Sequence, residues 1–474
     1  MTIDEETALL SRPVPKPRTP LPKLQLSVIM LIQICEPIAS QSIYPYINQL
    51  VSELDITGGD EKKVGYYAGL IESLFFLTEA MTVLQWSRAS DLFGRKPILL
   101  IGLFGTGSSI LCFGLSRTFW ALVVSRCLCG LLNGNIGVMK SAVGDLTDRT
   151  NRAEAYAFLP IVWAIGASVG PLIGGSLARP HDRFPEIFSA AFWQDFPYFL
   201  PCVATGGFVF LSWFAVLAFF KETVPSRNQK RHGLTEVGSE DISRADSPPT
   251  VMSHKHVGPL PMRELLGFPV IISVANYVAL AFLNTTLGAL LPLFMAMPRE
   301  IGGLGLPPPT IGIVLSAYGL TTGLFQILFF ARFVRRFGEK RVFVNGMITC
   351  LPVFALFPII SSIAQRFGLS IVVWGLIGCV LALGALMDTS FGAIFMFITA
   401  SAPKSSRGTV NGLSQTSAAL ARAIGPALST SLFSLSVQYN LLGGYFVYVF
   451  FFVLSGLALV LAEHLPNQIW EDIE

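Results

Sequence analysis

Twelve apolar segments, each about long enough to cross a bilayer, dominate this 474-residue chain. A helix needs about 20 apolar residues to cross the ~30 Å hydrocarbon core. The chain also has a mean hydropathy of +0.60 and 13% charged residues, where soluble domains carry about 25%. We therefore exclude an ordinary soluble enzyme and predict an all-α integral membrane protein. Its transmembrane helices are expected at about 25–47, 64–86, 97–115, 119–140, 154–178, 197–220, 268–291, 310–331, 342–363, 370–395, 407–436 and 441–462.

The longest polar stretch divides the twelve predicted helices into six and six. This stretch is rich in Ser, Pro, His and charge, a composition that cannot bury a core. We interpret it as a linker between two six-helix bundles. The expected parts are a cytoplasmic N-terminal tail (1–24), an N-terminal bundle (25–220), a cytoplasmic linker (221–267), a C-terminal bundle (268–462) and a cytoplasmic C-terminal tail (463–474).

Two sequence echoes relate the halves. Arg152 precedes a Gly-Pro pair by 18 residues, and Arg407 does the same in the second half, an offset of 255. DLFGRK at 91–96 similarly echoes RRFGEK at 335–340. Two similar six-helix halves are what a transporter needs if one half rocks against the other around a central site.

The distribution of Lys and Arg between the predicted loops indicates the topology. With a cytoplasmic N-terminus, the inside segments hold 24 of these residues and the outside segments hold 7. This asymmetry places both termini in the cytoplasm. The polar, Pro-rich opening of the chain is expected to be a tail and not a cleaved signal peptide.

Composition also limits the partners. A net charge of +3 is too balanced for a nucleic-acid binder. The seven cysteines all fall in apolar runs and read as small buried hydrophobes. All five histidines lie outside the predicted helices, so we expect no metal site and no cofactor. An acidic dileucine pattern between Glu5 and Leu10 leaves the plasma membrane and the vacuolar membrane both open.

The link between the second and third predicted helices has the composition of a gate. Asp91 ends one helix, Gly94 permits a tight turn, and Arg95 and Lys96 follow. Asp91 can pair with a cation or a helix N-terminus in one gate state only; the alternative is a positively charged inside loop without a gating role. Arg152 and Arg407, at matching entrances of the fifth and eleventh helices, are further gate candidates or plain solvated charges.

The fifth predicted helix carries small residues at regular spacing. Glycines at i, i+4 and i+8 form a smooth face for a neighbouring helix, and a proline bends the span. The candidate packing hinge comprises Gly166, Gly170, Pro171, Gly174 and Gly175.

Six ionisable residues fall inside predicted membrane helices. A charge in hydrocarbon costs at least about 2–3 kcal/mol, so each should face a central cavity or a partner. We expect a substrate-binding or proton-coupling role for these six, with structural carboxyls or packing ion pairs as the alternative; Asp388 and Arg422 are expected either to pair or to line the cavity. The candidates are Glu36, Glu72, Glu79, Arg126, Asp388 and Arg422.

The combined motifs resemble the major facilitator superfamily, drug:proton antiporter branch. Asp91, Gly94, Arg95 and Lys96 resemble its loop 2–3 signature, Arg126 to Gly130 resembles its R-x-x-x-G, and the glycines of the fifth helix resemble its span-5 signature. Other stretches, including NGLSQTSAALARAIGPA, are similar to zinc-induced-facilitator-like and fungal multidrug transporters. The resemblance implies a role for Arg126 in proton coupling. Ser87 stands where the loop 2–3 signature usually opens with Gly. Arg335 stands where the matching loop of the second half would carry an acid like Asp91.

The expected function is proton-coupled export or vacuolar sequestration of a small organic molecule, such as a secondary metabolite or xenobiotic. Four intramembrane acids against two bases favour cationic or amphipathic substrates. We expect a monomer whose partners are its substrate, protons and the bilayer. The alternatives are a facilitated-diffusion uniporter or symporter, and a transporter-like receptor. An enzyme is disfavoured, because the sequence shows no intramembrane His and no nucleophile–base pair.

Overall fold

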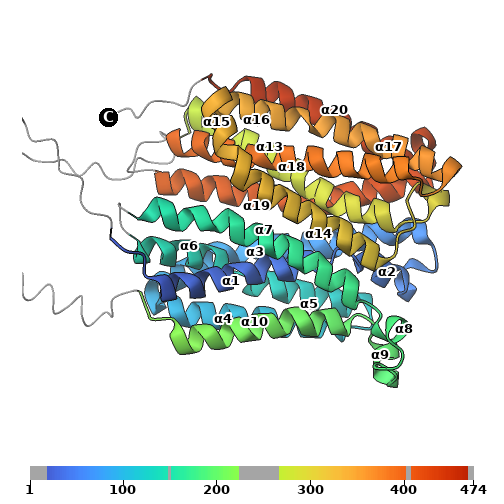
Figure 1. Ribbon diagram of the computed structural model, residues 1–474, viewed down its shortest axis with the longest axis horizontal. Coiled ribbons are helices and arrows are strands. Elements are labelled where there is room, and N and C mark those ends of the chain that lie inside the picture. Colours follow the sequence, from blue (N-terminus) through green and yellow to red (C-terminus); the bar gives the residue numbers. More distant parts are fainter. Residues whose placement is uncertain (1–18, 148–150, 224–265, 402–406, 468–474) are drawn as a thin grey trace, which may run out of the picture.

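Every regular element that the structure describes is a helix (Figure 1). The computed structural model describes residues 19–147, 151–223, 266–401 and 407–467. Among these residues, eleven helices are long and apolar enough to cross a membrane. A twelfth helix, Arg152–Leu177, contributes the shorter apolar segment Ile161–Leu177. The prediction of an all-α membrane fold with twelve spans is confirmed.

The helices form two bundles, one from each half of the chain (Figure 1). The first comprises α1 (Lys23–Gln41), α3 (Val64–Phe93), α4 (Arg95–Gly114), α5 (Phe119–Leu132) with α6 (Asn135–Leu146), α7 (Arg152–Leu177) and α10 (Phe199–Phe219). The second comprises α13 (Phe268–Ala296), α14 (Pro308–Phe325) with α15 (Ala331–Phe337), α16 (Glu339–Ile348) with α17 (Cys350–Phe367), α18 (Ile371–Ala400), α19 (Arg407–Gln438) and α20 (Phe446–Glu463). Short helices α2 (Ile47–Ser52), α8 (Pro180–Arg183) and α9 (Ala191–Asp195) lie in connections.

Several predicted helices differ from the observed ones. The fourth is interrupted at Asn133-Gly134, between α5 and α6. The eighth contains a π-helical turn, Gln326–Phe330, between α14 and α15. The first ends at Gln41 and the last begins at Phe446, where the sequence reading had extended the helices to 47 and back to 441. Apolar composition alone does not mark these ends, because the neighbouring turns are apolar too.

The two ends of the molecule differ in how closely the bundles approach. We call the end where α1 begins and α20 ends the terminal end, and the opposite end, with α2, α8 and α9, the distal end (Figure 1). The most extensive packing between the bundles joins α7 to α14 and α3 to α19. The close approaches on α3 begin at Gly65 and Gly69, against the distal half of α19. Towards the terminal end, Met81 and Leu84 of α3 are exposed. The bundles are therefore closed against each other near the distal end.

The echoes between the two halves appear in the fold. α7 begins at Arg152 and α19 at Arg407, the offset seen in the sequence. Gly94 and Gly338 stand at equivalent sharp links and share an unusual backbone, with φ of 102° and 81°. Such positive φ values favour glycine, which has no Cβ to clash. The paired links therefore support the reading of the two halves as structural repeats.

Candidate functional site

The centre of the first bundle holds a buried ion pair. Arg126 Nη2 of α5 lies 2.8 Å from Glu72 Oε2 of α3, and the two residues are 2% and 4% exposed. The Tyr44 hydroxyl donates to the other carboxylate oxygen, Oε1, at 2.9 Å. The Arg126 guanidinium also stands 4.4 Å from the centre of the Phe75 ring. The two charges therefore compensate each other inside the bundle, where a single unpaired charge would be strongly unfavourable.

A second polar contact repeats the first, two helical turns along. Asn133 Nδ2 donates to Glu79 Oε1 at 3.0 Å. Glu79 follows Glu72 by seven residues and Asn133 follows Arg126 by seven, so the same register of α3 against α5 serves both contacts. Seven residues span 700° of helix, which returns side chains to nearly the same face. The sequence reading that both glutamates share one face is confirmed.

Gly130 allows α3 and α5 to approach closely enough for these contacts. A Cβ atom at Gly130 would overlap the Thr78 hydroxyl and the Phe75 carbonyl oxygen of α3. The R-x-x-x-G pattern from Arg126 to Gly130 therefore has a physical basis here: the arginine pairs with the neighbouring helix, and the glycine one turn later leaves room for it.

A small cavity adjoins the arginine. It has a volume of about 10 Å³ and is lined by residues that include Ser42, Ser109, Ser125 and Arg126. Within the described part of the chain, Arg126 Nε makes no hydrogen bond. A space of this size is at the lower limit for one water molecule, and the serine hydroxyls provide polar partners for it.

Glu36 and Arg422 lie near the same region. Glu36 of α1 is partly exposed and interacts electrostatically with Cys129 of α5, as do Glu72 and Glu79. Arg422 of α19 belongs to the second bundle, and it is the strongest electrostatic partner of Glu79. The ion pairs of the described residues, taken within 4 Å, do not include one between these two side chains. Arg422 therefore faces the first bundle at longer range.

Among the described residues, Asp388 does not form an ion pair with Arg422. Pairing of these two side chains was one of the two predicted arrangements. Asp388 Oδ1 accepts from Asn284 Nδ2 at 2.7 Å, and Oδ2 accepts from the Tyr318 hydroxyl at 2.8 Å. Its backbone carbonyl accepts from Gln326 Nε2 at 3.2 Å. The partners come from α13 and α14, so three helices of the second bundle meet at this carboxylate.

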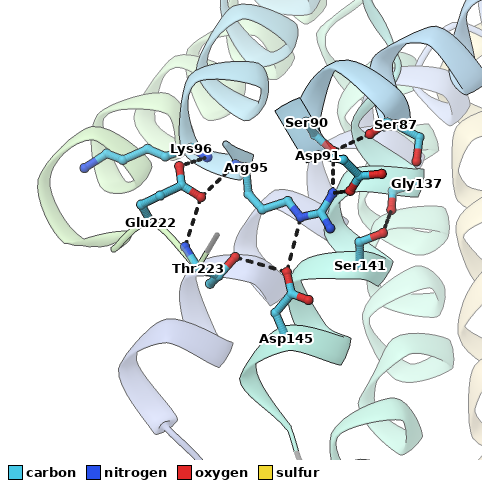
Figure 2. Close-up of polar contacts among 10 residues, drawn as sticks. All are labelled: Ser87, Ser90, Asp91, Arg95, Lys96, Gly137, Ser141, Asp145, Glu222 and Thr223. Carbon is cyan, nitrogen blue, oxygen red and sulfur yellow. Dashed lines mark hydrogen bonds and ion pairs between the residues drawn. The ribbon is translucent and has the colours of Figure 1, made fainter. Parts of the chain in front are cut away.

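The candidate gate at the terminal end forms one connected cluster (Figure 2). Arg95 Nη1 lies 2.6 Å from Asp91 Oδ1, and Arg95 Nε lies 3.2 Å from Asp145 Oδ2 of α6. Glu222, just after α10, accepts from the backbone N–H groups of Arg95 and Lys96 at 2.8 and 3.0 Å. Arg95 is thus shared by two carboxylates, and Glu222 caps the N-terminus of α4 from 126 residues away.

Gly94 makes this cap possible. Its φ of 102° turns the chain from α3 into α4, and a Cβ atom there would lie 2.5 Å from Glu222 Oε2. Lys96 reaches back with Nζ to the Leu217 carbonyl oxygen at 2.9 Å. The start of the linker therefore contacts the loop between α3 and α4, which carries the gate candidates. The side chains of Arg152 and Arg407, the other gate candidates, lie outside the described residues.

The glycines of α7 are packing positions. Cβ atoms at Gly166 and Gly170 would overlap α1, and one at Gly174 would overlap Ser42 directly after α1. A Cβ at Gly175 would lie 2.4–2.9 Å from Pro308 and Gly312 of α14. The predicted smooth face is present, and it lies against α1 of the same bundle. The carbonyl of Pro171 lies 2.5 Å from where a Cβ of Gly312 would stand, so α7 also fits closely against the second bundle.

A cleft of about 700 Å³ lies at the outer edge of the distal end, beyond the closed contact of the bundles, and is lined by helix ends and connections of both bundles. Its polar wall comes from the first bundle, where Arg179 Nη1 lies 2.7 Å from Glu53 and Nε lies 2.5 Å from Asp182. The Tyr198 hydroxyl donates to Glu53 at 2.9 Å. Burial acts to lower the pKa of Arg179, but Glu53 and Asp182 outweigh it and raise that pKa. This cluster joins the ends of three spans.

Several functional contacts were not predicted from the sequence. Tyr44 lies in the turn between α1 and α2, and Asn284 and Tyr318 lie in the apolar helices α13 and α14. The sequence around these three residues carries no local signal of their partners. Asn133 stands in an Asn-Gly pair, a turn signal that could have indicated the break between α5 and α6. Glu222 follows a helix end in the sequence, and only the fold shows that it faces the gate loop.

Comparison with known proteins agrees with this architecture. The family model of the Major Facilitator Superfamily matches residues 29–426 and 277–469. The chain is 30% identical to the major facilitator superfamily multidrug transporter mfsB of Aspergillus fumigatus, over 88% of this chain and 79% of that protein. It is 28% identical to Protein ZINC INDUCED FACILITATOR 1 of Arabidopsis thaliana, over 88% of this chain and 85% of the relative.

The fold has the same relationship to solved structures. The crystal structure of a D-xylose-proton symporter superposes with a TM-score of 0.69 at 15% identity, covering 94% of this chain and 98% of the symporter. The expected likeness to fungal multidrug transporters and zinc-induced facilitators is confirmed. This chain belongs to the major facilitator superfamily, and it is a multi-pass membrane transporter, not an enzyme.

Proposed function

We propose that this transporter moves a small organic molecule out of the cytoplasm, by export or by sequestration, in exchange for protons. The observation that carries the proposal is the buried contact of Glu72 with Arg126 and Tyr44. It gives a proton a defined acceptor whose charge is balanced by one nearby cation. Being named a multidrug transporter, the fungal relative supports a small organic substrate.

Protonation of Glu72 would change the forces inside the first bundle. A neutral carboxyl no longer attracts Arg126 as an ion, so the guanidinium is left as a buried cation with a weaker partner. Its remaining acidic neighbours are Glu79 and Glu36, which interact with the same part of α5. Proton binding therefore couples to a rearrangement between α3 and α5, the helices that hold the pair. A change in those helices is a change in the wall of the transport path.

The contact between the bundles gives this rearrangement a route to alternating access. α3 carries both glutamates and also packs against α19 of the second bundle. Arg422 of α19 acts electrostatically on Glu79 from across that boundary. A proton on Glu79 removes this attraction and so weakens one interaction between the bundles. Transport then follows the opening and closing of the bundles around the central region.

The proposed topology defines which way the transporter faces. The excess of Lys and Arg in the terminal-end loops supports a cytoplasmic location for that end and for both termini. With the bundles closed near the distal end, this conformation is the one that receives substrate from the cytoplasm. The Asp91–Arg95–Asp145 cluster lies within the first bundle here, and we propose that Asp91 engages the second bundle when the terminal end closes.

The experiment is gradient-driven uptake into proteoliposomes that contain the purified protein and an acidic lumen. A panel of cationic, neutral and zwitterionic organic molecules is offered to wild type, Glu72→Gln and Glu36→Gln. Glu186→Gln, an exchange of an exposed carboxyl in the connection between α8 and α9, is the matched control. The proposal predicts accumulation that an ionophore abolishes and that Glu72→Gln reduces at least about tenfold, while Glu186→Gln transports like wild type.

A facilitated-diffusion uniporter or a symporter is the competing function. It predicts equilibration without accumulation, or accumulation that requires the opposite gradient. Survival of gradient-independent uptake in Glu72→Gln and Glu36→Gln would assign these carboxyls a structural role and overturn the proposal.

A further inference from the structure

A second intramembrane carboxylate, far along the chain from the Glu72–Arg126 pair, differs from it in one respect. Asp388 accepts hydrogen bonds from Asn284 and Tyr318, which are neutral. Among the described residues, none of the ion pairs within 4 Å contains Asp388. In the described part of the chain, Glu72 therefore has a paired cation and Asp388 has neutral partners.

An uncompensated carboxylate inside a membrane protein requires an explanation. A charge there costs at least about 2–3 kcal/mol, and such residues are usually functional. An asparagine could accept only one of these two hydrogen bonds, because its Nδ2 is a donor, so the pair of donors specifies a carboxyl group with two acceptor oxygens. Asp388, Asn284 and Tyr318 are each partly exposed, so a ligand can reach the group.

The carboxylate also has room for another donor. An ionised carboxylate offers about four lone-pair sites, and the hydrogen bonds from Asn284 and Tyr318 use two of them. The Thr322 hydroxyl lies beside Asp388 and Tyr318 and contributes to the electrostatics of both groups. With Thr322 counted as a third donor, acceptor capacity is still left over on the carboxylate.

The backbone around the carboxylate is irregular as well. Gln326, which donates to the Asp388 carbonyl, begins the π-helical turn Gln326–Phe330 between α14 and α15. π-helical turns are rare and frequently occur at functional sites. This irregularity lies in the helix that packs most extensively against the first bundle. The Asp388 site thus belongs to the second bundle and lies near the boundary between the two bundles.

We propose that Asp388 binds the positively charged nitrogen of the transported substrate, and that the substrate is an organic cation. Tyr318, Asn284 and Thr322 orient the carboxylate. This inference rests on the proposed function for the existence of an organic substrate. It adds the chemical class of that substrate and divides the tasks: proton exchange in the first bundle and cation recognition in the second.

Gly384 allows the contact between Tyr318 and Asp388 to be disturbed without changing a charge. It lies one helical turn before Asp388, and a Cβ atom there would stand 3.0 Å from the Tyr318 hydroxyl oxygen and 3.1 Å from Cε2. Alanine at this position would displace the tyrosine from the carboxylate without changing any charge. Gly378 of the same helix has nothing within 4 Å of its Cβ position, so Gly378→Ala is a matched control.

The experiment measures equilibrium binding to the purified full-length protein, without a proton gradient. The probes are ethidium and phenethylammonium, with the neutral 2-phenylethanol for comparison. Loss of one hydrogen bond to a charged group corresponds to about 10- to 100-fold in affinity. We expect Asp388→Asn to weaken cation binding by this factor and to leave the neutral probe unaffected. We expect Gly384→Ala to weaken it several-fold, Gly378→Ala to match wild type and Asp388→Glu to restore part of the loss.

Three results would overturn the inference. The first is a wild-type protein that binds none of the cations better than the neutral probe. The second is an Asp388→Asn protein that keeps wild-type cation affinity, including one that loses proton flux instead, since Asp388 would then be a proton site. The third is equal loss of cationic and neutral probes, which would indicate a structural role. Should Asp388→Asn not fold, Tyr318→Phe and Gly384→Ala give the same readout. Because binding is measured without a gradient, failure of proton coupling is a separate result.

Discussion

Breaking the Glu72–Arg126 pair should destabilise the first bundle strongly. Both side chains are almost fully buried and their charged atoms are 2.8 Å apart. Removing one partner of a buried ion pair costs about 3–5 kcal/mol, because the other charge is left uncompensated. This corresponds to roughly 10²- to 4×10³-fold in the unfolding equilibrium constant. Glu72→Gln, which strands Arg126, is therefore expected to show this loss.

The assay is a double-mutant cycle on unfolding in mixed micelles, with wild type, Glu72→Gln, Arg126→Met and the double variant. The double variant removes both charges, so we expect it to be more stable than the sum of the single losses predicts. Arg117→Ala is the control: its ion pair with Asp195, at 2.9 Å, is more than half exposed and is expected to contribute about 1 kcal/mol or less. Additive losses in the cycle would show that the two charges do not stabilise each other, and the coupling argument would fail.

Three further predictions concern close packing and the gate. Gly130→Ala should separate α3 from α5 and lower stability by about 1–3 kcal/mol, whereas Gly137→Ala, whose nearest neighbour atoms are 3.7 Å away, should not; equal melting temperatures would contradict this. Gly174→Ala should be similarly damaging because its Cβ would overlap the backbone of Ser42, directly after α1, and a protein with wild-type stability and transport would refute it. Glu222→Ala should cost about 0.5–2 kcal/mol through loss of the helix cap and slow the transport cycle; unchanged turnover would remove Glu222 from the gate.

The membrane fold was predictable from the sequence because apolar length is a direct requirement of the bilayer. The two halves were also visible in the sequence, because similar residues recur at an offset of 255. Interruptions such as the π-helical turn at Gln326–Phe330 were not predictable, because four of its five residues are apolar and continue the hydropathy pattern of the span. Helix ends beside apolar turns, as at Gln41, were missed for the same reason.

The candidate site divided along similar lines. Charged residues in apolar helices were found at once, since their presence in hydrocarbon is unusual. Their partners depend on how the helices pack. Glu72 pairs with Arg126, whereas Asp388 accepts hydrogen bonds from Asn284 and Tyr318 and does not pair with Arg422. Neutral polar side chains occur in many membrane helices for packing reasons, so the sequence does not distinguish a hydrogen-bond donor to a carboxylate from any other.

The central claim is exchange of substrate for protons, and the most direct test is to record lumenal pH while substrate enters. Proteoliposomes with an acidic lumen and a trapped pH-sensitive dye receive a transported cation from outside. Antiport predicts that the lumen becomes more alkaline when substrate is added, with wild-type protein and not with Glu72→Gln. No change of lumenal pH during substrate entry would mean uniport, and further acidification would mean symport; either result would contradict the account.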